Sequence, residues 1–197
     1  MLRILGWGFD PSVFYLKKAI KMKFSSKLLL FFLLLATSKA AAQSGLPEPK
    51  LEFIFEAKVT LDPVHEIGFT TYGKRRIIPI NGGTFEGPNI RGVVVPGGAD
   101  WQTVRADGTA DLEARYTLKT DDGVLIYIQN KGIRHAKPEV LARMAKGEKV
   151  DPSEYYMRTA ASFEVADGKY AWLNKAVVIS TGARMSDHVL LKFYRVL

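Results

Sequence analysis

The chain has 197 residues and no cysteine, and its 28 Lys and Arg against 20 Asp and Glu give a formal net charge of +8. The absence of cysteine excludes disulfide bonds and thiol chemistry, so the fold must be held together by its core. Seven of the basic residues and one acid precede Gln43, which leaves 21 basic and 19 acidic residues after it. This near balance, without a basic stripe, argues against a nucleic-acid partner.

The N-terminal segment has the pattern of an export leader. Leu28 to Ala36 is a run of nine apolar residues, whereas a membrane-spanning helix needs roughly twenty. Lysines precede the run and three alanines, at positions 40–42, follow it, as in a bacterial Sec-type signal peptide. We therefore expect residues 1–42 to be a signal-peptide region cleaved after Ala42, with Met22 as the hypothetical true start. The mature protein is then periplasmic or secreted and meets the membrane only through its leader; a short uncleaved anchor is the alternative.

Residues 43–50 are a polar, proline-containing segment that we expect to be loose, and residues 51–197 form the single domain. Leu51 to Leu61 alternates between apolar and polar residues, with Ile54 as the exception, and this period of two predicts a half-buried strand. Further short apolar runs, separated by turn residues, also predict strands: 75–80, 91–96, 101–105, 112–120, 124–131, 158–165, 172–180 and 188–196.

One helix is predicted from Pro138 to about Lys146, because proline stands in its first turn and Gly147 just past its end. Many short strands with regular turn signals indicate an all-β sandwich or barrel. The pairs Gly82-Gly83 and Gly97-Gly98 lack the strand–loop–helix context of a phosphate-binding loop, and we interpret both as turns.

The turn Asp121-Asp122-Gly123 fixes the register of one predicted hairpin. A three-residue loop that ends in a left-handed glycine pairs Thr120 with Val124. One face of the hairpin is then apolar, and the other carries Glu113, Arg115, Tyr127 and Gln129. In a barrel this polar face either lines a cavity, where Arg115 would bind an anionic or carbonyl oxygen, or is a solvated outer face with cross-strand pairs.

Two further strands carry candidate residues, each with two interpretations. On 158–165, Arg158 and Glu164 share a face, so that Glu164 is either a base or ligand partner or one half of a surface ion pair. Trp172 and Asn174 suit a ring-bearing ligand, or equally a core tryptophan beside an asparagine that satisfies a turn. The three histidines lack the spacing of a metal site, and we predict neither metal nor cofactor.

The ordered motifs of the chain resemble a known family. They include Pro79 to Pro88, Val95 to Gln102, Ala114 to Leu118, Gly132 to His135, Tyr155 to Arg158 and Tyr170 to Asn174. Together they resemble the domain-of-unknown-function family 3237, also called uncharacterised protein family 0311, from about Leu51 to Leu197. The resemblance implies a single antiparallel β-barrel of lipocalin-like or calycin-like shape with one short helix, often oligomeric. It implies little about a reaction, because some members of the family look like cofactor-free cyclases or isomerases and others have no assigned role.

The resemblance further suggests which residues act. Its recurrent polar positions, with two aromatic companions, fall on Asp100, Trp101, Arg115, Tyr127, Arg134, Arg158, Glu164, Trp172, Asn174 and Arg184. In an enzyme, Asp100 or Glu164 would move a proton, and Arg115 with Tyr127 would hold a developing oxyanion. The other residues would contact the ligand.

Three functions are therefore open. The first is an exported barrel that binds a small anionic or aromatic molecule in its interior. The second is a cofactor-independent cyclase or isomerase acting on a small carbonyl-bearing substrate. The third is a structural or interaction protein whose barrel is filled with side chains and whose partner could be a second copy of the chain. We place binding first because no catalytic constellation is visible apart from the resemblance.

Overall fold

The structure is a computed structural model in which residues 45–197 are described, and Glu48–Leu197 form one compact unit. The predicted signal-peptide region, its cleavage after Ala42 and the start at Met22 lie outside the described residues. No helix between residues 45 and 197 is both long and apolar enough to cross a membrane.

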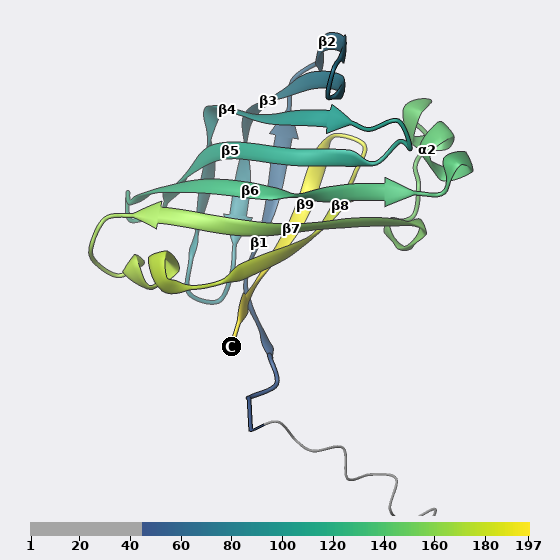
Figure 1. The fold of residues 1–197 in the computed structure, drawn as a ribbon. Coiled ribbons are helices and arrows are strands. Elements are labelled where there is room, and N and C mark those ends of the chain that lie inside the picture. The colour runs from purple at the N-terminus through teal and green to yellow at the C-terminus, as the bar shows by residue number, and fades with distance from the viewer. Residues whose placement is uncertain (1–44) are drawn as a thin grey trace, which may run out of the picture. The chain divides into compact units, whose positions relative to one another are not determined.

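The compact unit is a closed antiparallel β-barrel of eight strands, which confirms the predicted fold class (Figure 1). The chain order is β1 (Leu51–Leu61), β2 (His65–Thr70), β3 (Gly73–Glu86), β4 (Arg91–Val104), β5 (Ala110–Thr120), β6 (Leu125–Ala136), β7 (Tyr155–Val165), β8 (Val178–Arg184) and β9 (His188–Val196). The sheet runs β1-β9-β8-β7-β6-β5-β4-β3, and the pairing of β1 with β3 closes it. Strand β2 pairs with β3 alone and projects from the barrel as a hairpin (Figure 1).

The predicted helix is confirmed as α2 (Pro138–Ala145), which lies at one end of the barrel, next to the end of β6 (Figure 1). Proline occupies its first turn, where no backbone N–H is needed. Val140 and Met144, four residues apart, turn to the same side of the helix and are buried. Two short 3₁₀ helices, η1 (Pro152–Glu154) and η2 (Ala171–Lys175), flank β7.

The predicted hairpin register is confirmed for β5 and β6, because Lys119 pairs with Leu125 and Ala110 with Arg134. Thr120 N donates to Val124 O at 2.9 Å, and Gly123 has a φ of +87°, as the three-residue loop requires. The apolar face of the hairpin faces the barrel interior, where Tyr116, Leu118, Ile126 and Ile128 are buried.

The interpretation of the two glycine pairs as turns is wrong. Both lie inside strands: the register shifts between Ile80 and Thr84 in β3, and between Val95 and Ala99 in β4. Such bulges bend a strand without reversing it. Glycine is needed there because a Cβ on Gly83 would lie 2.0 Å from Lys58 O, and one on Gly98 would lie 2.5 Å from Tyr116 Cβ.

The structure explains the break in the alternation of β1 and corrects the start of the predicted strand 172–180. A register shift between Phe53 and Phe55 turns Ile54 inward and leaves Phe53 partly exposed, which explains the exception in the alternation of β1. The predicted strand 172–180 begins only at Val178, because its first part forms η2.

The core fills one part of the barrel interior with apolar side chains. Phe55 stacks on Phe193 with ring centroids 4.5 Å apart, and Phe85 and Phe163 meet Phe55 edge to face. Aromatic clusters of this kind contribute beyond the area that they bury. The remaining interior is not filled.

Candidate functional site

A cavity of about 380 Å³ lies within the barrel. Its lining includes exposed residues from the β1–β2 connection (Pro63, Val64) and from the β8–β9 turn (Met185, Ser186), so the cavity opens to solvent between these two loops. Pockets for small molecules typically measure about 300–1,000 Å³, and this one is at the lower end of that range.

The walls of the cavity are mainly apolar. Period-two alternation turns one side chain in two toward the inside of each strand, and the inward residues here are Val59, Leu61, Ile78, Ile80, Leu112, Met157, Val189 and Leu191. Ala114 lies between larger neighbours and contributes only a methyl group. An apolar lining of this kind suits a ligand with a hydrocarbon or aromatic body.

A fixed chain of polar side chains crosses the inner side of β3 and β4. Arg76 donates from Nε and Nη2 to Gln102 Oε1, at 2.9 and 2.7 Å. This orients the carboxamide, so that Gln102 Nε2 donates to Asp100 Oδ2 at 2.5 Å. The other oxygen, Asp100 Oδ1, accepts from the backbone N–H of Glu113 at 2.9 Å. The carboxyl of Asp100 is therefore held in one orientation.

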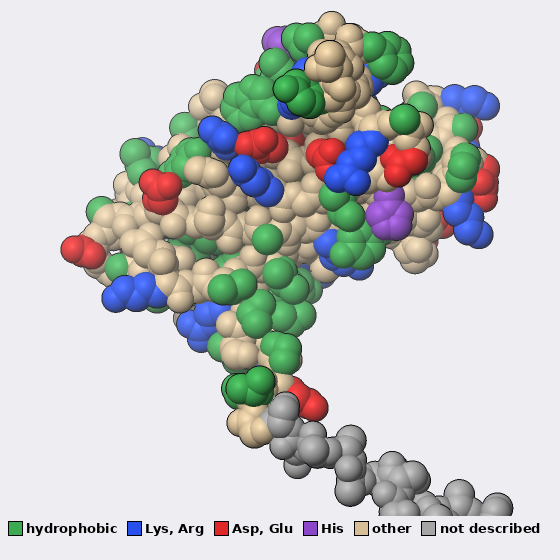
Figure 2. Space-filling view, viewed as in Figure 1, with side chains coloured by type: hydrophobic (Ala, Val, Ile, Leu, Met, Phe, Trp, Pro, Cys, Tyr) green, Lys and Arg blue, Asp and Glu red, His purple; other side chains and the backbone are tan. Residues whose placement is uncertain are grey.

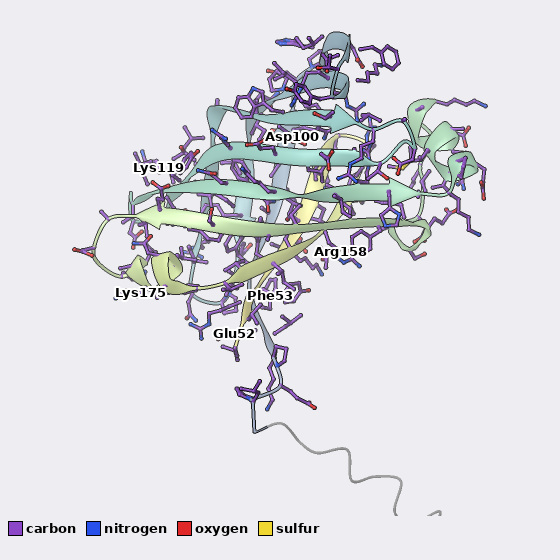
Figure 3. The ribbon with its side chains drawn as sticks, viewed as in Figure 1. Glu52, Phe53, Asp100, Lys119, Arg158 and Lys175 are labelled. Carbon is purple, nitrogen blue, oxygen red and sulfur yellow. The ribbon has the colours of Figure 1, made fainter. Side chains whose placement is uncertain are left out.

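Burial determines the protonation of Asp100, which Figure 3 shows on β4. Desolvation raises the pKa of this carboxyl above its ordinary value of 3.8, and this outweighs the donors and the arginines that favour the ionised form. A carboxyl with a raised pKa retains a proton at higher pH than usual and can donate it.

Three guanidinium groups line the same cavity: Arg76, Arg134 and Arg184. Burial lowers the pKa of Arg134 to about 10, and the charges of Arg76 and Arg184 contribute in the same direction. Within residues 45–197 none of the three forms an ion pair, and Arg134 Nε has no hydrogen-bond partner. Asp100 opposes part of this repulsion at Arg76 and Arg134, and Glu66 opposes part of it at Arg76, without forming an ion pair with either. Guanidinium groups in this arrangement can bind an anion.

Two acidic residues lie at the mouth of the cavity, and the carboxylate of each contacts a neighbouring polar side chain. Asp62 Oδ1 accepts from Asn81 Nδ2 at 2.6 Å, and Asp187 Oδ1 lies 2.8 Å from His188 Nδ1. The Asp187 side chain is 80% exposed, so solvent screens its charge. The inner part of the cavity retains a positive excess.

The innermost polar groups of the cavity have no partners in the described part of the chain. Tyr116 Oη and Asn130 Oδ1 have no hydrogen-bond partner there, although both residues are only 3% exposed. In the register of the barrel, Ala114 pairs with Asp100 on one side and with Asn130 on the other. The carboxyl and the carboxamide thus stand on either side of a single methyl group.

The residues expected from the sequence are divided between the cavity and the outer surface. Asp100, Arg134 and Arg184 line the cavity. Arg115, Tyr127 and Glu164 come together on the outer face of β5, β6 and β7, where Tyr127 is the cross-strand partner of Glu164. They do not line the cavity, because the bulge-free β5–β6 register turns these positions outward.

The polar face of the β5–β6 hairpin is therefore the solvated one. Glu113 Oε1 pairs with Arg115 Nη2 at 2.7 Å and with Lys131 Nζ at 3.2 Å. Figure 2 shows acidic and basic side chains side by side on the outer surface of the barrel. Trp101 also faces outward, in a shallow depression with Arg75 and Arg115.

The three remaining candidates have structural partners. Asn174 brackets Val165, accepting from its N–H at 2.9 Å and donating to its carbonyl at 2.8 Å. Arg195 lies over the ring of Trp172. Arg158 is an exposed residue of β7 (Figure 3), and its Nη1 donates to Met157 O at 2.8 Å. None of these residues lines the cavity.

Four cavity residues were missed by sequence reasoning: Arg76, Gln102, Tyr116 and Asn130. The signal for two of them was present, because the hairpin register places Tyr116 and Asn130 on the apolar face, where polar atoms need partners. Gln102 follows Asp100 by two residues and shares its face. As for metals, residues 45–197 contain no cluster of three His, Asp or Glu arranged to hold an ion.

The fold and the cavity define a class: closed antiparallel β-barrels with a polar site inside an otherwise apolar interior. The family whose description is "Protein of unknown function (DUF3237)" matches residues 49–196, and the chain belongs to this family. The membership predicted from the motifs is confirmed.

Known relatives agree with this assignment. A protein of family UPF0311 from Clostridium acetobutylicum is 40% identical over 154 residues, which cover 78% of this chain and 98% of the relative. A β-barrel-like protein from Acinetobacter baumannii superimposes with a TM-score of 0.70 at 44% identity, covering 79% of this chain and all of the other.

A more distant relative carries a name that describes an activity. The hydroalkoxylation enzyme phnH of Penicillium herquei is 27% identical over 163 residues, covering 83% of this chain and 94% of that enzyme. A crystal structure of an enzyme from the same fungus has a TM-score of 0.59 at 26% identity, covering 77% of this chain and 98% of the other.

Proposed function

We propose that this barrel binds a small organic anion with an apolar or aromatic body inside its cavity. One observation carries the proposal: three guanidinium groups line one cavity without an ion pair, beside a carboxyl whose ionisation burial opposes. The apolar walls would contact the body of the ligand, and Arg134 with Arg184 would bind its charged end. Arg76 donates two hydrogen bonds to Gln102, so it would add positive charge to the cavity without binding the ligand directly.

The unfilled interior also bears on the third hypothesis. A structural or interaction protein was expected to have a barrel packed with side chains, whereas this interior has room for a small ligand. We further propose that the protein meets its ligand outside the cytoplasm, because of the leader expected in residues 1–42.

The test is a calorimetric titration of the mature protein with small aromatic carboxylates and their neutral amides. We expect the carboxylates to bind and the amides to bind at least about tenfold more weakly, since a charge-assisted hydrogen bond contributes about 1.5–3 kcal/mol. Arg134→Met should remove this preference, because methionine keeps the apolar stem and loses the charge.

Arg115→Met is the matched control, because it removes the same group from the outer face, where Arg115 pairs with Glu113. This variant should bind the carboxylates like the wild type. Equal binding of acids and amides, or unchanged carboxylate binding by Arg134→Met, would contradict the proposal.

A second function is favoured by Asp100, the carboxyl whose pKa burial raises. We propose as the alternative that the cavity catalyses a cofactor-independent proton transfer. A relative named for hydroalkoxylation, the addition of an O–H group across a carbon–carbon double bond, supports this class of reaction. In such a reaction Asp100 would give its proton to one alkene carbon. The hydroxyl oxygen of the substrate would bond to the other carbon, and its proton would restore the Asp100 carboxyl.

The two functions differ in what is recovered after incubation. A binding protein returns its ligand unaltered. An enzyme of the proposed kind, given an ortho-allyl phenol in D₂O, returns a cyclic ether with deuterium on carbon. Asp100→Asn should abolish this incorporation, while the outer-face variant Glu164→Gln should not.

A further inference from the structure

We propose that Tyr116 and Asn130 form an inner subsite for a neutral hydroxyl group of the ligand, so that the ligand is a hydroxy-substituted carboxylate. This rests on the proposed binding of an organic anion and specifies its class. The carboxylate would lie toward Arg134 and Arg184, and the hydroxyl would lie beside Ala114.

The first support is the lack of partners. Buried polar atoms in native proteins almost always form hydrogen bonds, and each exception requires an explanation. Tyr116 Oη and Asn130 Oδ1 are such exceptions, and both residues are among those that line the cavity. Because both residues are 97% buried and line the cavity, a ligand held there is the partner that we infer for them.

The second support is the arrangement of these groups around free space. Asp100, Ala114 and Asn130 occupy paired positions on β4, β5 and β6, and Tyr116 is the next inward residue on β5. Any larger residue in place of Ala114 would fill the gap between the carboxyl and the carboxamide. Tyr116 lies near enough to feel the charge of Asp100, yet no hydrogen bond joins the two.

The third support is the chemistry of the two unpaired atoms. A phenolic O–H donates, and a carboxamide oxygen accepts. One group that accepts from Tyr116 and donates to Asn130 is a hydroxyl, whereas an ether or a ketone can only accept. A second carboxylate is disfavoured here, because it can only accept and would leave the carboxamide oxygen of Asn130 without a donor.

The two ends of the cavity therefore select different groups. The arginines favour a charged oxygen, and the Tyr116–Asn130 pair favours an uncharged one that both donates and accepts. The apolar residues between them would contact the carbon skeleton. A ligand with both groups would bind in one direction only.

The experiment uses three pairs of probes of increasing length: benzoate, phenylacetate and 3-phenylpropanoate, each with and without a para-hydroxyl. Affinities are measured by calorimetry on the mature wild type, Tyr116→Phe, Asn130→Leu and the outer-face control Tyr127→Phe. In the wild type we expect the hydroxyl to improve the affinity of at least one pair by about tenfold. This advantage should be lost in Tyr116→Phe and in Asn130→Leu, and retained in Tyr127→Phe.

The outcomes separate this inference from the proposed function. Carboxylates that bind through Arg134 but gain nothing from a hydroxyl would overturn the subsite and leave anion binding intact. A hydroxyl advantage that persists in both inner variants would also overturn it. If no probe of either kind binds, the anion-binding proposal fails, and the subsite fails with it. The two inner variants are independent, so a folding defect in one still leaves the other to decide.

Discussion

At the scale of single residues, Asp100 shows how a barrel interior alters an ordinary side chain. Its two oxygens are oriented by Gln102 and by the backbone of Glu113, and burial opposes its ionisation. A carboxyl that is both oriented and reluctant to ionise is uncommon outside functional sites. The same environment links the stability of the barrel to pH.

The folded-state pKa of Asp100 is raised above its ordinary value of 3.8. The stabilisation from its proton is therefore complete below that value, and is lost as the pH rises through the folded-state pKa. We expect the unfolding free energy of the wild type, minus that of Asp100→Asn, to fall by up to about 1.4 kcal/mol per pH unit in this window. Urea unfolding of both proteins at a series of pH values would measure it.

The sign of this effect is the decisive feature. A difference that stays constant across the acidic range, or that grows as the pH rises, would mean that Asp100 is not desolvated in the folded protein. Asparagine at this position loses one of the two accepted hydrogen bonds, so only the pH dependence, and not the absolute difference, is informative.

Part of the site could be predicted at this scale. The motif resemblance pointed to Asp100, Arg134 and Arg184, which line the cavity. It could not separate them from Arg115, Tyr127 and Glu164, since the direction of a side chain depends on strand parity rather than on residue type. Parity was predicted for the β5–β6 hairpin and for the strand 158–165, but in both cases the polar face could be either the cavity side or the outer side.

At the scale of elements, the shortest junction of the barrel is that between β7 and β8. Only four residue pairs join these strands, from Arg158–Thr181 to Ala161–Val178, whereas β6 and β7 are paired along their length. Within this short junction, Thr159 Oγ1 and Ser180 Oγ lie 2.5 Å apart and are buried. This hydrogen bond ties the two strands together inside the barrel.

Removing one hydroxyl of this pair should be costly, because it leaves the other buried without a partner. We expect Ser180→Ala to lower the unfolding free energy by about 1–3 kcal/mol. The double variant Thr159→Val/Ser180→Ala should be destabilised by less than the sum of the single variants, since neither unpaired hydroxyl remains. A double-mutant cycle from denaturant unfolding measures the difference, and strictly additive effects would rule out the coupling.

The elements themselves were predictable where local sequence decides the structure. The strand 51–61, the helix at 138 and the β5–β6 register follow from alternation, capping and turn chemistry. The bulges at Gly82-Gly83 and Gly97-Gly98 were not, because a glycine pair in a bulge and one in a turn look alike in sequence. What distinguishes them is the approach of a neighbouring strand, such as Lys58 at Gly83, which is a tertiary fact.

At the scale of the whole molecule, all the barrel strands lie between Leu51 and Val196. A chain that starts at Gln43 therefore contains every residue of the barrel and of its cavity. We expect the protein recovered outside the cytoplasm to begin at Gln43 and to unfold in one cooperative transition. Intact-mass measurement and thermal unfolding check the two parts. A recovered mass that includes the leader, in the membrane fraction, would support the uncleaved anchor instead.

The surface of the barrel also has a distinctive hairpin. Strand β2 pairs on one side only, and Figure 2 shows hydrophobic side chains gathered where this hairpin projects. Ile67, Phe69 and Tyr72 are more than half exposed there.

The closure of the barrel sets the order of events during synthesis. Strand β1, the first to leave the ribosome, pairs with β9, the last, and Leu51 meets Val196. Strand β1 and the cavity wall that it supplies lack their partner β9 until the chain is finished. The nascent protein therefore has no closed barrel at any stage of translation. If the leader directs export as proposed, a chain that meets the export machinery during translation would do so before its barrel has closed. The cavity would then be completed only at the destination of the chain.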